Sequence, residues 1–374
     1  GVRGIAPRAS LKSFNYADAS TESNLISSLG GESYSANVDV FNHSLGTTYR
    51  KFLNVSAAKT MLFNVAVPTL RAGKGALIVN SVGNSFSEAK GRRDLCGINP
   101  GYRFSCNDAN LTDPIHIFPT ILNVAALNAD GVKTTYSTPG AVVWVSGFGG
   151  EYGHDAAYAR FINSSEDDQK PAMMTTDASG CDKGYSGTGD SFLATSALNS
   201  FDYSAPPRPE NSACNYVSTF NGTSSAAPTV AGVIALMLEA NPELTWRDTK
   251  HIIASTARQV DSEFVPVGLG TTTYYSWETN AAGFKFHNWY GFGAIDAASA
   301  VAMAKSYVPD SLGPYALSEW HESGVIDHSV PEDKAEALSI NVNHDDIENR
   351  TVEMVQVAVW LSHELPSTLG IRLE

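Results

Sequence analysis

Short runs of mostly apolar, uncharged residues recur along the first half of the chain, and they constrain its fold more than any other feature. Continuous apolar runs are typical of strands that are covered on both faces of a sheet. Between two of them, residues 57–72 carry apolar side chains at helical spacing, and we expect Pro68 to kink or end that helix. The alternation predicts an α/β domain with a mainly parallel sheet. The expected strands cover residues 76–79, 121–127 and 141–145, with a further short strand at residues 36–41.

The balance of charges narrows the range of partners. The chain has 39 acidic and 25 basic residues, which gives a formal net charge of -14. An acidic surface repels nucleic acid and anionic membranes, so we expect no nucleic-acid partner. No stretch approaches the roughly 20 apolar residues of a membrane span, and the apolar run at residues 232–238 is short. Because 43% of the residues are hydrophobic, the chain can bury a sizeable core.

Four cysteines indicate the cellular compartment. Cys96, Cys106, Cys181 and Cys214 allow three pairings, and no CxxC motif points to zinc or thiol redox chemistry. Their spacing favours a local pair, Cys96–Cys106, and a longer pair, Cys181–Cys214. Disulfide bonds form in oxidising compartments, so the sequence predicts a secreted protein.

Two regions depart from the α/β pattern. Residues 151–216 are rich in Ser, Asp, Gly and Asn, and a loop this long is uncommon in a compact domain. We interpret it as an insertion, either a lid or binding surface over a site, or an ordinary surface loop. After residue 313 the pattern changes to short alternating segments, such as residues 338–342 and 351–360. The predicted domains are therefore residues 1–310 and a β-rich second domain, residues 314–374.

The strongest local motif is Asn221-Gly-Thr-Ser-Ser-Ala-Ala-Pro228, which leads into an almost uncharged segment, residues 224–240, expected to be a buried helix. A serine hydroxyl is a poor nucleophile unless a base and anion-stabilising donors lie close to it. The N-terminus of a buried helix supplies such donors as free N–H groups. The alternative reading of the helix start is that Thr223 or Ser224 only caps a core helix. Two further helices are expected at residues 246–257, with a capping box at Thr245, and at residues 297–307.

The string Gly222-Thr-Ser-Ser-Ala-Ala-Pro228 resembles the nucleophile motif of the subtilisin-like serine proteases. The resemblance implies that Ser224 is the nucleophile. Ile78-Val-Asn-Ser-Val-Gly-Asn84 is similar to the strand whose final asparagine completes the oxyanion hole, which implies that role for Asn84; read alone, Gly-Asn is ordinary turn material. Ser44-Leu45-Gly46 resembles the strand that pairs with the substrate backbone and lines the S1 pocket.

Two other stretches, residues 238–248 and 287–296, resemble the kexin/furin-like convertase branch, and residues 362–373 resemble a strand of its P domain. The resemblance implies a subtilisin-like sheet with helices on both faces, followed by the start of a P domain. It also implies structural calcium and protein or peptide substrates. Because the insertion at residues 151–216 directly precedes the nucleophile motif, a separate hypothesis is that it covers part of the cleft or binds a propeptide or chaperone. Thr138 stands where the branch has a calcium-binding glutamate. Asp108 falls near its second S1 carboxylate, with a solvated loop residue as the alternative.

The histidines do not complete a catalytic triad of this family. The order along the chain in subtilases is Asp, His, Ser, and none of the nine histidines lies in an HGT-type context. We therefore expect the catalytic Asp and His before Gly1 and interpret His43 as a packed strand residue. On this view the 374 residues alone are nearly inactive. Two functions remain open: a serine endopeptidase, with a preference for basic residues as one option, or a catalytically incomplete fragment or pseudoprotease that acts as a binding module.

Overall fold

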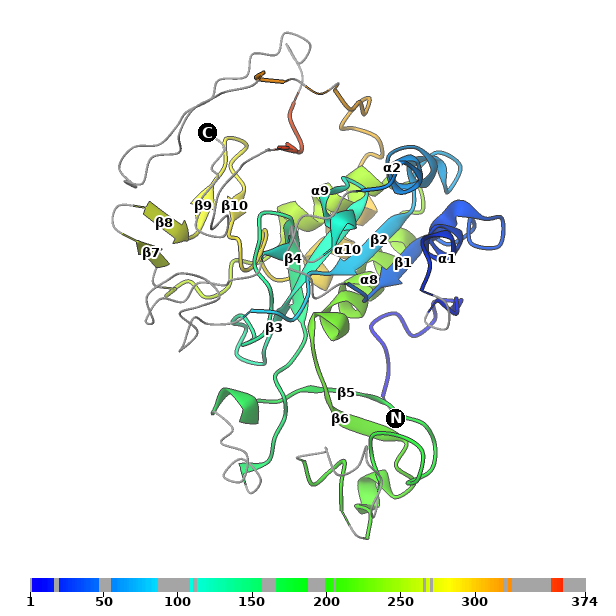
Figure 1. The fold of residues 1–374 in the computed structure, drawn as a ribbon, viewed down its shortest axis with the longest axis vertical. Coiled ribbons are helices and arrows are strands. Elements are labelled where there is room, and N and C mark those ends of the chain that lie inside the picture. Colours follow the sequence, from blue (N-terminus) through cyan, green and yellow to red (C-terminus); the bar gives the residue numbers. More distant parts are fainter. Residues whose placement is uncertain are drawn as a thin grey trace.

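A four-stranded parallel sheet in the order β1-β2-β3-β4 organises the molecule in this computed structural model (Figure 1). Its strands are β1 (Val40–His43), β2 (Leu77–Ser81), β3 (Ile121–Leu127) and β4 (Val143–Phe148). All four predicted strands are present, although β1 begins four residues later than expected. The structure describes residues 2–16, 20–46, 55–86, 108–109, 113–156, 166–187, 199–204, 206–264, 267–269, 272–318, 320, 322–324 and 351–358.

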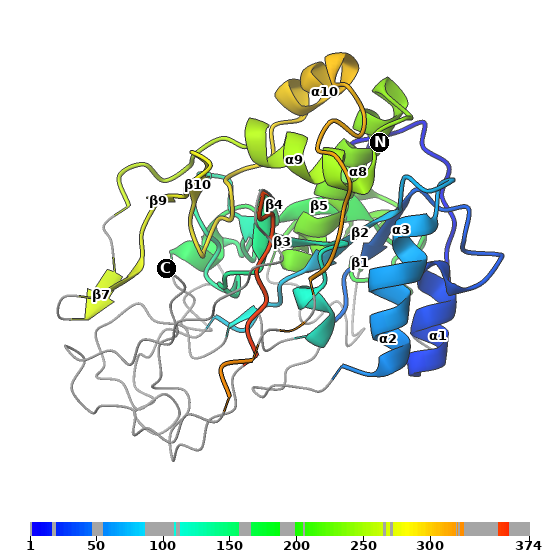
Figure 2. The same cartoon turned by 90° about the horizontal axis from the view of Figure 1, so that it is seen from above.

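Helices cover both faces of the sheet. The side chains of β2 alternate between the two faces and contact different helices on each. Leu77 and Val79 pack against the face covered by α8 (Thr223–Ala240), α9 (Trp246–Thr256) and α10 (Ala297–Ser306). Ile78 packs on the opposite face. Helices α1 (Glu22–Ile26), α2 (Ala57–Met61) and α3 (Val67–Thr69) cover that face (Figure 2), together with the π-helical turns η2 (Ser27–Gly31) and η3 (Leu62–Ala66). Both faces of β2 are therefore dry, which explains its continuous apolar sequence.

Helix α8 is the central helix of the fold. It contacts β1, β2, β3 and β4, and its small residues Ala226 and Ala227 are fully buried. By length and composition it would also be able to cross a membrane, but half of it is buried inside the protein. A buried core helix of a globular domain satisfies the same test, so α8 is no indication of a membrane span.

The predicted capping box at Thr245 is confirmed. Thr245 Oγ1 accepts a hydrogen bond from Asp248 N at 3.1 Å, and Asp248 Oδ2 accepts one from Thr245 N at 2.9 Å. These reciprocal bonds start α9 at Trp246. Asp296 likewise caps α10 through Ser299 N. As predicted, the helical segment ends close to Pro68: it continues from α2 through the π-helical turn η3 into α3 and stops at Thr69, one residue after the proline.

The region predicted as an insertion carries regular structure near its base. Strand β5 (Met173–Thr176) pairs antiparallel with β6 (Tyr216–Phe220). A disulfide bond joins Cys181 to Cys214, as predicted. In Figure 1 this layer lies beyond the N-terminal end of α8, apart from the main sheet. The second predicted pair, Cys96–Cys106, lies outside the described residues. Short segments elsewhere are η4 (Pro114–Ile117), η5 (Asp167–Gln169), η6 (Pro209–Asn211), β7 (Val267–Leu269), β8 (Thr272–Tyr275), β9 (Glu278–Thr279) and β10 (Lys285–Phe286).

Near the C-terminal end, residues 351–358 lack the strand structure that their alternation predicted. They contact α9 and η4 instead. The guanidinium of Arg247 binds the carboxylate of Glu353, and Gln356 Nε2 donates to the carbonyl of Ile117 at 2.7 Å. Residues 338–342 and 362–373 lie outside the described part, so the division into domains 1–310 and 314–374 stays a prediction.

Candidate active site

The nucleophile turn joins β6 to α8. Gly222 is the residue before α8 and has φ +102°, a conformation that favours glycine. Ser224 follows as the second residue of the helix. The N–H of Ser224 has no hydrogen-bond partner among the residues that the structure describes. The helix start therefore presents a free donor beside the Ser224 hydroxyl, with the positive end of the helix dipole behind it.

Asn84 lies across from this turn, and Thr223 orients its side chain. Both Thr223 N and Thr223 Oγ1 donate to Asn84 Oδ1, each at 2.8 Å. With its oxygen engaged, the amide group presents Nδ2 to the nucleophile turn, where a Cβ atom on Gly222 would lie 3.0 Å from Nδ2. Asn84 itself is exposed. Two segments that are far apart in sequence thus bring together the donors Asn84 Nδ2 and Ser224 N–H.

Ser44 contacts the nucleophile directly, and Pro228 explains why. Proline has no N–H, so Pro228 cannot bond the carbonyl four residues earlier in the helix, which is that of Ser224. Ser44 Oγ donates to this carbonyl at 3.0 Å instead. In return Ser224 Oγ lies 3.4 Å from the carbonyl oxygen of Ser44. The first residue after β1 is therefore attached to the first turn of α8.

The other predicted binding residues surround this centre. Leu45 and Gly46 follow Ser44; Leu45 is 46% exposed, and a Cβ atom on Gly46 would meet nothing within 4 Å. Asp108 approaches the turn at Gly140, where a Cβ atom would lie 2.6 Å from Asp108 Oδ1. This turn follows Thr138, whose Oγ1 accepts a hydrogen bond from Ser85 N at 3.0 Å.

His43 is placed as a packed strand residue. It is 8% exposed, and its Nδ1 lies 2.9 Å from Asn80 Oδ1. Burial lowers the pKa of His43, which keeps the ring neutral. In the described part of the chain, the hydrogen-bond contact of Ser224 Oγ is with the Ser44 carbonyl and not with a histidine.

Two residues of this arrangement were not identified as functional from the sequence. Thr223 stands inside the motif, but its bonds to Asn84 span 139 positions of the chain. Tyr136 is also buried here, and its hydroxyl accepts a hydrogen bond from Gly222 N at 2.8 Å. Nothing in the local sequence around Tyr136 signals that contact, because its partner is 86 positions away.

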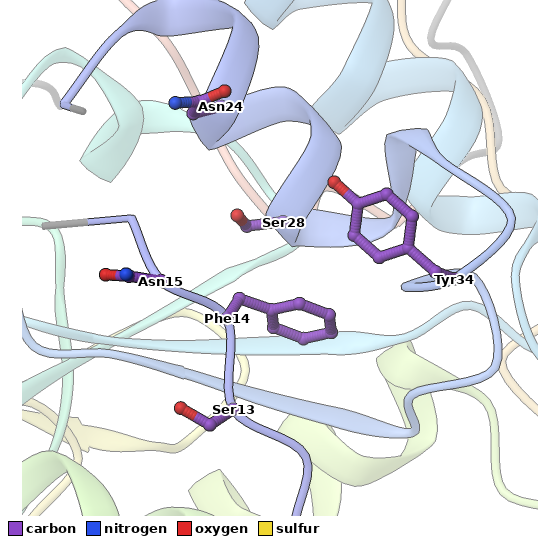
Figure 3. A pocket seen from close by; sticks show the side chains of 6 residues that line it. All are labelled: Ser13, Phe14, Asn15, Asn24, Ser28 and Tyr34. Atoms are coloured by element: carbon purple, nitrogen blue, oxygen red, sulfur yellow. The ribbon is translucent and has the colours of Figure 1, made fainter. Parts of the chain in front are cut away.

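A surface hollow lies elsewhere, between the N-terminal stretch and α1 (Figure 3). Phe14 and Tyr34 stand side by side there, with ring centroids 5.9 Å apart. Its lining contains none of the residues discussed above: it consists of Ser13, Phe14, Asn15, Asn24, Ser28 and Tyr34. Among the described residues, no group of three or more His, Cys, Asp or Glu side chains is arranged to hold a metal ion.

Comparisons with known proteins agree with this geometry. Residues 1–293 match the model of the subtilase family. The extracellular serine protease of Aeromonas sobria is 32% identical over 99% of this chain, which spans 58% of that protein. Its crystal structure superposes with a TM-score of 0.66, covering 82% of this chain and 50% of the other. The proprotein convertase subtilisin/kexin type 5 of Rattus norvegicus is 31% identical over 65% of this chain and 13% of its own length. With the sheet, the nucleophile turn and these matches in agreement, the chain belongs to the subtilase family.

Proposed function

We propose that the protein is a serine endopeptidase that cleaves peptide bonds through an acyl-enzyme on Ser224. Ser224 Oγ attacks the scissile carbonyl carbon while a base removes its proton. The base then returns that proton to the leaving amine, and water hydrolyses the ester that remains. The observation that carries the proposal is the pair of hydrogen bonds from Thr223 to Asn84 Oδ1. These bonds occupy the amide oxygen and leave Asn84 Nδ2 beside the free N–H of Ser224.

This pair of donors suits an oxyanion. Negative charge develops on the carbonyl oxygen only during attack, so donors that are already in place stabilise the transition state more than the substrate. We propose that Ser44 to Gly46 bind the substrate backbone, since Gly46 is open and Ser44 is joined to Ser224. The general base is proposed to be a histidine of the longer protein, which fits the contacts of Ser224 and the greater length of the relatives.

Labelling with a fluorophosphonate tests this proposal. We expect the natural full-length protein to be labelled at Ser224, the Ser224→Ala variant to remain unlabelled, and the 374-residue chain to react only slowly. Intact mass and peptide mapping locate the label. A full-length protein that binds peptides but is never labelled would instead be a pseudoprotease. Rapid labelling of the 374-residue chain would place the base inside it.

Specificity for basic residues is proposed from Asp108. Its carboxylate lies at the turn of Gly140, two residues after Thr138, and Thr138 Oγ1 accepts a hydrogen bond from Ser85 N, the residue next to Asn84. A carboxylate in the S1 pocket attracts Arg or Lys side chains. We expect Asp108→Asn to lower kcat/KM about tenfold for substrates with Arg at P1 and to leave those with Ala unchanged. An equal effect on both substrates would exclude this role.

The setting of the enzyme is also proposed. We propose that the protein is secreted, because it contains the Cys181–Cys214 disulfide and because the Aeromonas relative is extracellular. A propeptide or chaperone partner is proposed as well, since the Aeromonas sobria protease has been crystallised with a chaperone. To test for the partner, the full-length protein is pulled down from its natural host and the proteins bound to it are identified by mass spectrometry. Secretion assays of the full-length protein test the localisation. Structural calcium stays a proposal based on the family, to be tested by thermal unfolding with and without a chelator.

A further inference from the structure

The hydroxyl of Tyr136 joins the two ends of the segment between β4 and α8. It accepts a hydrogen bond from Gly222 N at 2.8 Å, where the chain leaves β6 and enters the nucleophile turn. It donates to the carbonyl groups of Gly150 and Gly149, where the chain leaves β4. Gly149 and Gly150 are themselves anchored, because their N–H groups donate to the carbonyl of Leu127 at the end of β3. The hydroxyl therefore connects the nucleophile turn to the rigid sheet.

The backbone of the same tyrosine holds the segment that carries Asn84. Phe86 N donates to the carbonyl of Tyr136 at 2.9 Å. Two residues later, Thr138 N donates to the carbonyl of Gly83, and Thr138 Oγ1 accepts from Ser85 N, both at 3.0 Å. The stretch from Tyr136 to Thr138 thus contacts the residues on both sides of Asn84. Through its side chain and its backbone, Tyr136 touches both segments that supply the donors of the oxyanion site.

Gly222 needs such an anchor. Glycine has the widest range of backbone conformations, and φ +102° at this position is one of many that it can adopt. The position also has no side chain of its own to fix it. A hydrogen bond to the Gly222 N–H therefore selects one conformation of the turn, and Ser225 Oγ supports it by donating to the carbonyl groups of Gly222 and Gly149, each at 2.8 Å.

We propose that Tyr136 is a positioning residue of the active site: its hydroxyl fixes the Gly222 peptide and thereby aligns the Ser224 N–H with Asn84 Nδ2. The inference rests on the proposed function in that these donors are assigned to an oxyanion. Tyr136 is 6% exposed and acts through Gly222, not by touching substrate. Burial raises its pKa far above the ordinary value, so the hydroxyl keeps the proton that it donates to Gly150.

The substitution Tyr136→Phe in the natural full-length protein tests the proposal, because it retains the buried ring and removes only the hydroxyl. We expect kcat on a fluorogenic peptide to fall between about 10-fold and 100-fold, since a misplaced reacting geometry costs on that order. KM should stay within about twofold, because the lost alignment matters in the transition state and not in substrate binding.

Tyr290→Phe is the matched control. Like Tyr136, Tyr290 is buried. Its hydroxyl also accepts a hydrogen bond from a backbone N–H, here Lys133 N at 3.2 Å, and donates one to an oxygen, here Asp261 Oδ2 at 2.6 Å. Both variants should lose comparable thermal stability, but only Tyr136→Phe should lose kcat. If the two variants show the same kcat at a temperature where both are folded, Tyr136 is merely structural and the proposal is wrong.

Hydrogen exchange provides a readout that needs no catalysis. In the wild-type protein we expect the Gly222 amide to exchange at least about 100-fold more slowly than an unprotected amide, and Tyr136→Phe to remove most of that protection. A rapidly exchanging Gly222 amide in the wild type would overturn the proposal even if the variant does not fold. If the wild-type protein cleaves no peptide and reacts with no fluorophosphonate, the proposed function fails, while exchange still decides the role of Tyr136.

Discussion

At the scale of single residues, the site depends on how one side-chain amide is held. An asparagine can turn either end toward a neighbour, and only one end donates hydrogen bonds. Thr223 removes this ambiguity, because its backbone N–H can only donate and therefore selects Asn84 Oδ1, to which the Thr223 hydroxyl also donates. The amide Nδ2 is then the end available to a substrate, which is the orientation that an oxyanion needs.

Replacement of Asn84 by alanine measures the contribution of this amide. We expect Asn84→Ala in the full-length protein to lower kcat by about 10²–10³, because one donor to a developing oxyanion contributes roughly 3–4 kcal/mol in acyl-transfer sites. KM should change far less, since the donor acts in the transition state. Steady-state kinetics on a peptide substrate checks this. Thr223→Ser, which keeps both donors to Asn84, serves as the control, and an unchanged kcat in Asn84→Ala would remove Asn84 from the mechanism.

At the scale of secondary-structure elements, the central helix α8 both packs in the core and carries the nucleophile. Pro228 interrupts the hydrogen bonds of α8 one turn after Ser224, and the freed carbonyl of Ser224 is taken up by Ser44. The carbonyl that lacks a hydrogen bond within the helix thereby links α8 to the end of β1. The sequence shows the proline in this helix but not which residue takes up the carbonyl that it leaves free, because Ser44 lies 180 positions away.

Some secondary-structure elements can be predicted from nearby residues alone, and others cannot. The start of α9 followed from the spacing of Thr245 and Asp248, and β3 was predicted with its observed bounds. Both need only the pattern of nearby residues. The predicted strand at residues 351–360 is different, because a strand also needs a partner. Residues 351–358 bind Arg247 and Ile117 through side chains instead.

At the scale of the whole molecule, buried histidines make stability depend on pH. His287 is 1% exposed and lies among aromatic rings that include Phe264 and Trp277. Its Nδ1 accepts a hydrogen bond from Trp289 N at 2.9 Å, which requires an unprotonated nitrogen. Burial lowers the pKa of His287 to about 4 from the usual 6.5. The unfolded chain therefore binds a proton at this residue between pH 6.5 and 4 that the folded protein does not bind.

The free energy of unfolding should accordingly decrease as the pH falls from 6.5 to 4, by on the order of 3 kcal/mol from this residue. Above pH 6.5 the contribution is constant. In His287→Asn the side-chain oxygen can still accept from Trp289 N but does not titrate, so we expect a shallower pH dependence. Chemical denaturation of both proteins at pH 7, 6 and 5 checks this, and parallel curves would show that His287 does not control the loss.

The sequence by itself determined the secondary structure of the sheet and its central helix and the family motif around Ser224, and its spacing favoured the Cys181–Cys214 pair among three possible pairings. Each of these rests on periodicity, on a short motif or on the spacing of a few residues. The tertiary structure alone decided that Tyr136 holds Gly222 and that Thr223 orients Asn84. These hydrogen bonds join residues 86 and 139 positions apart, and such partners are selected only when the packed sheet and α8 bring their segments together.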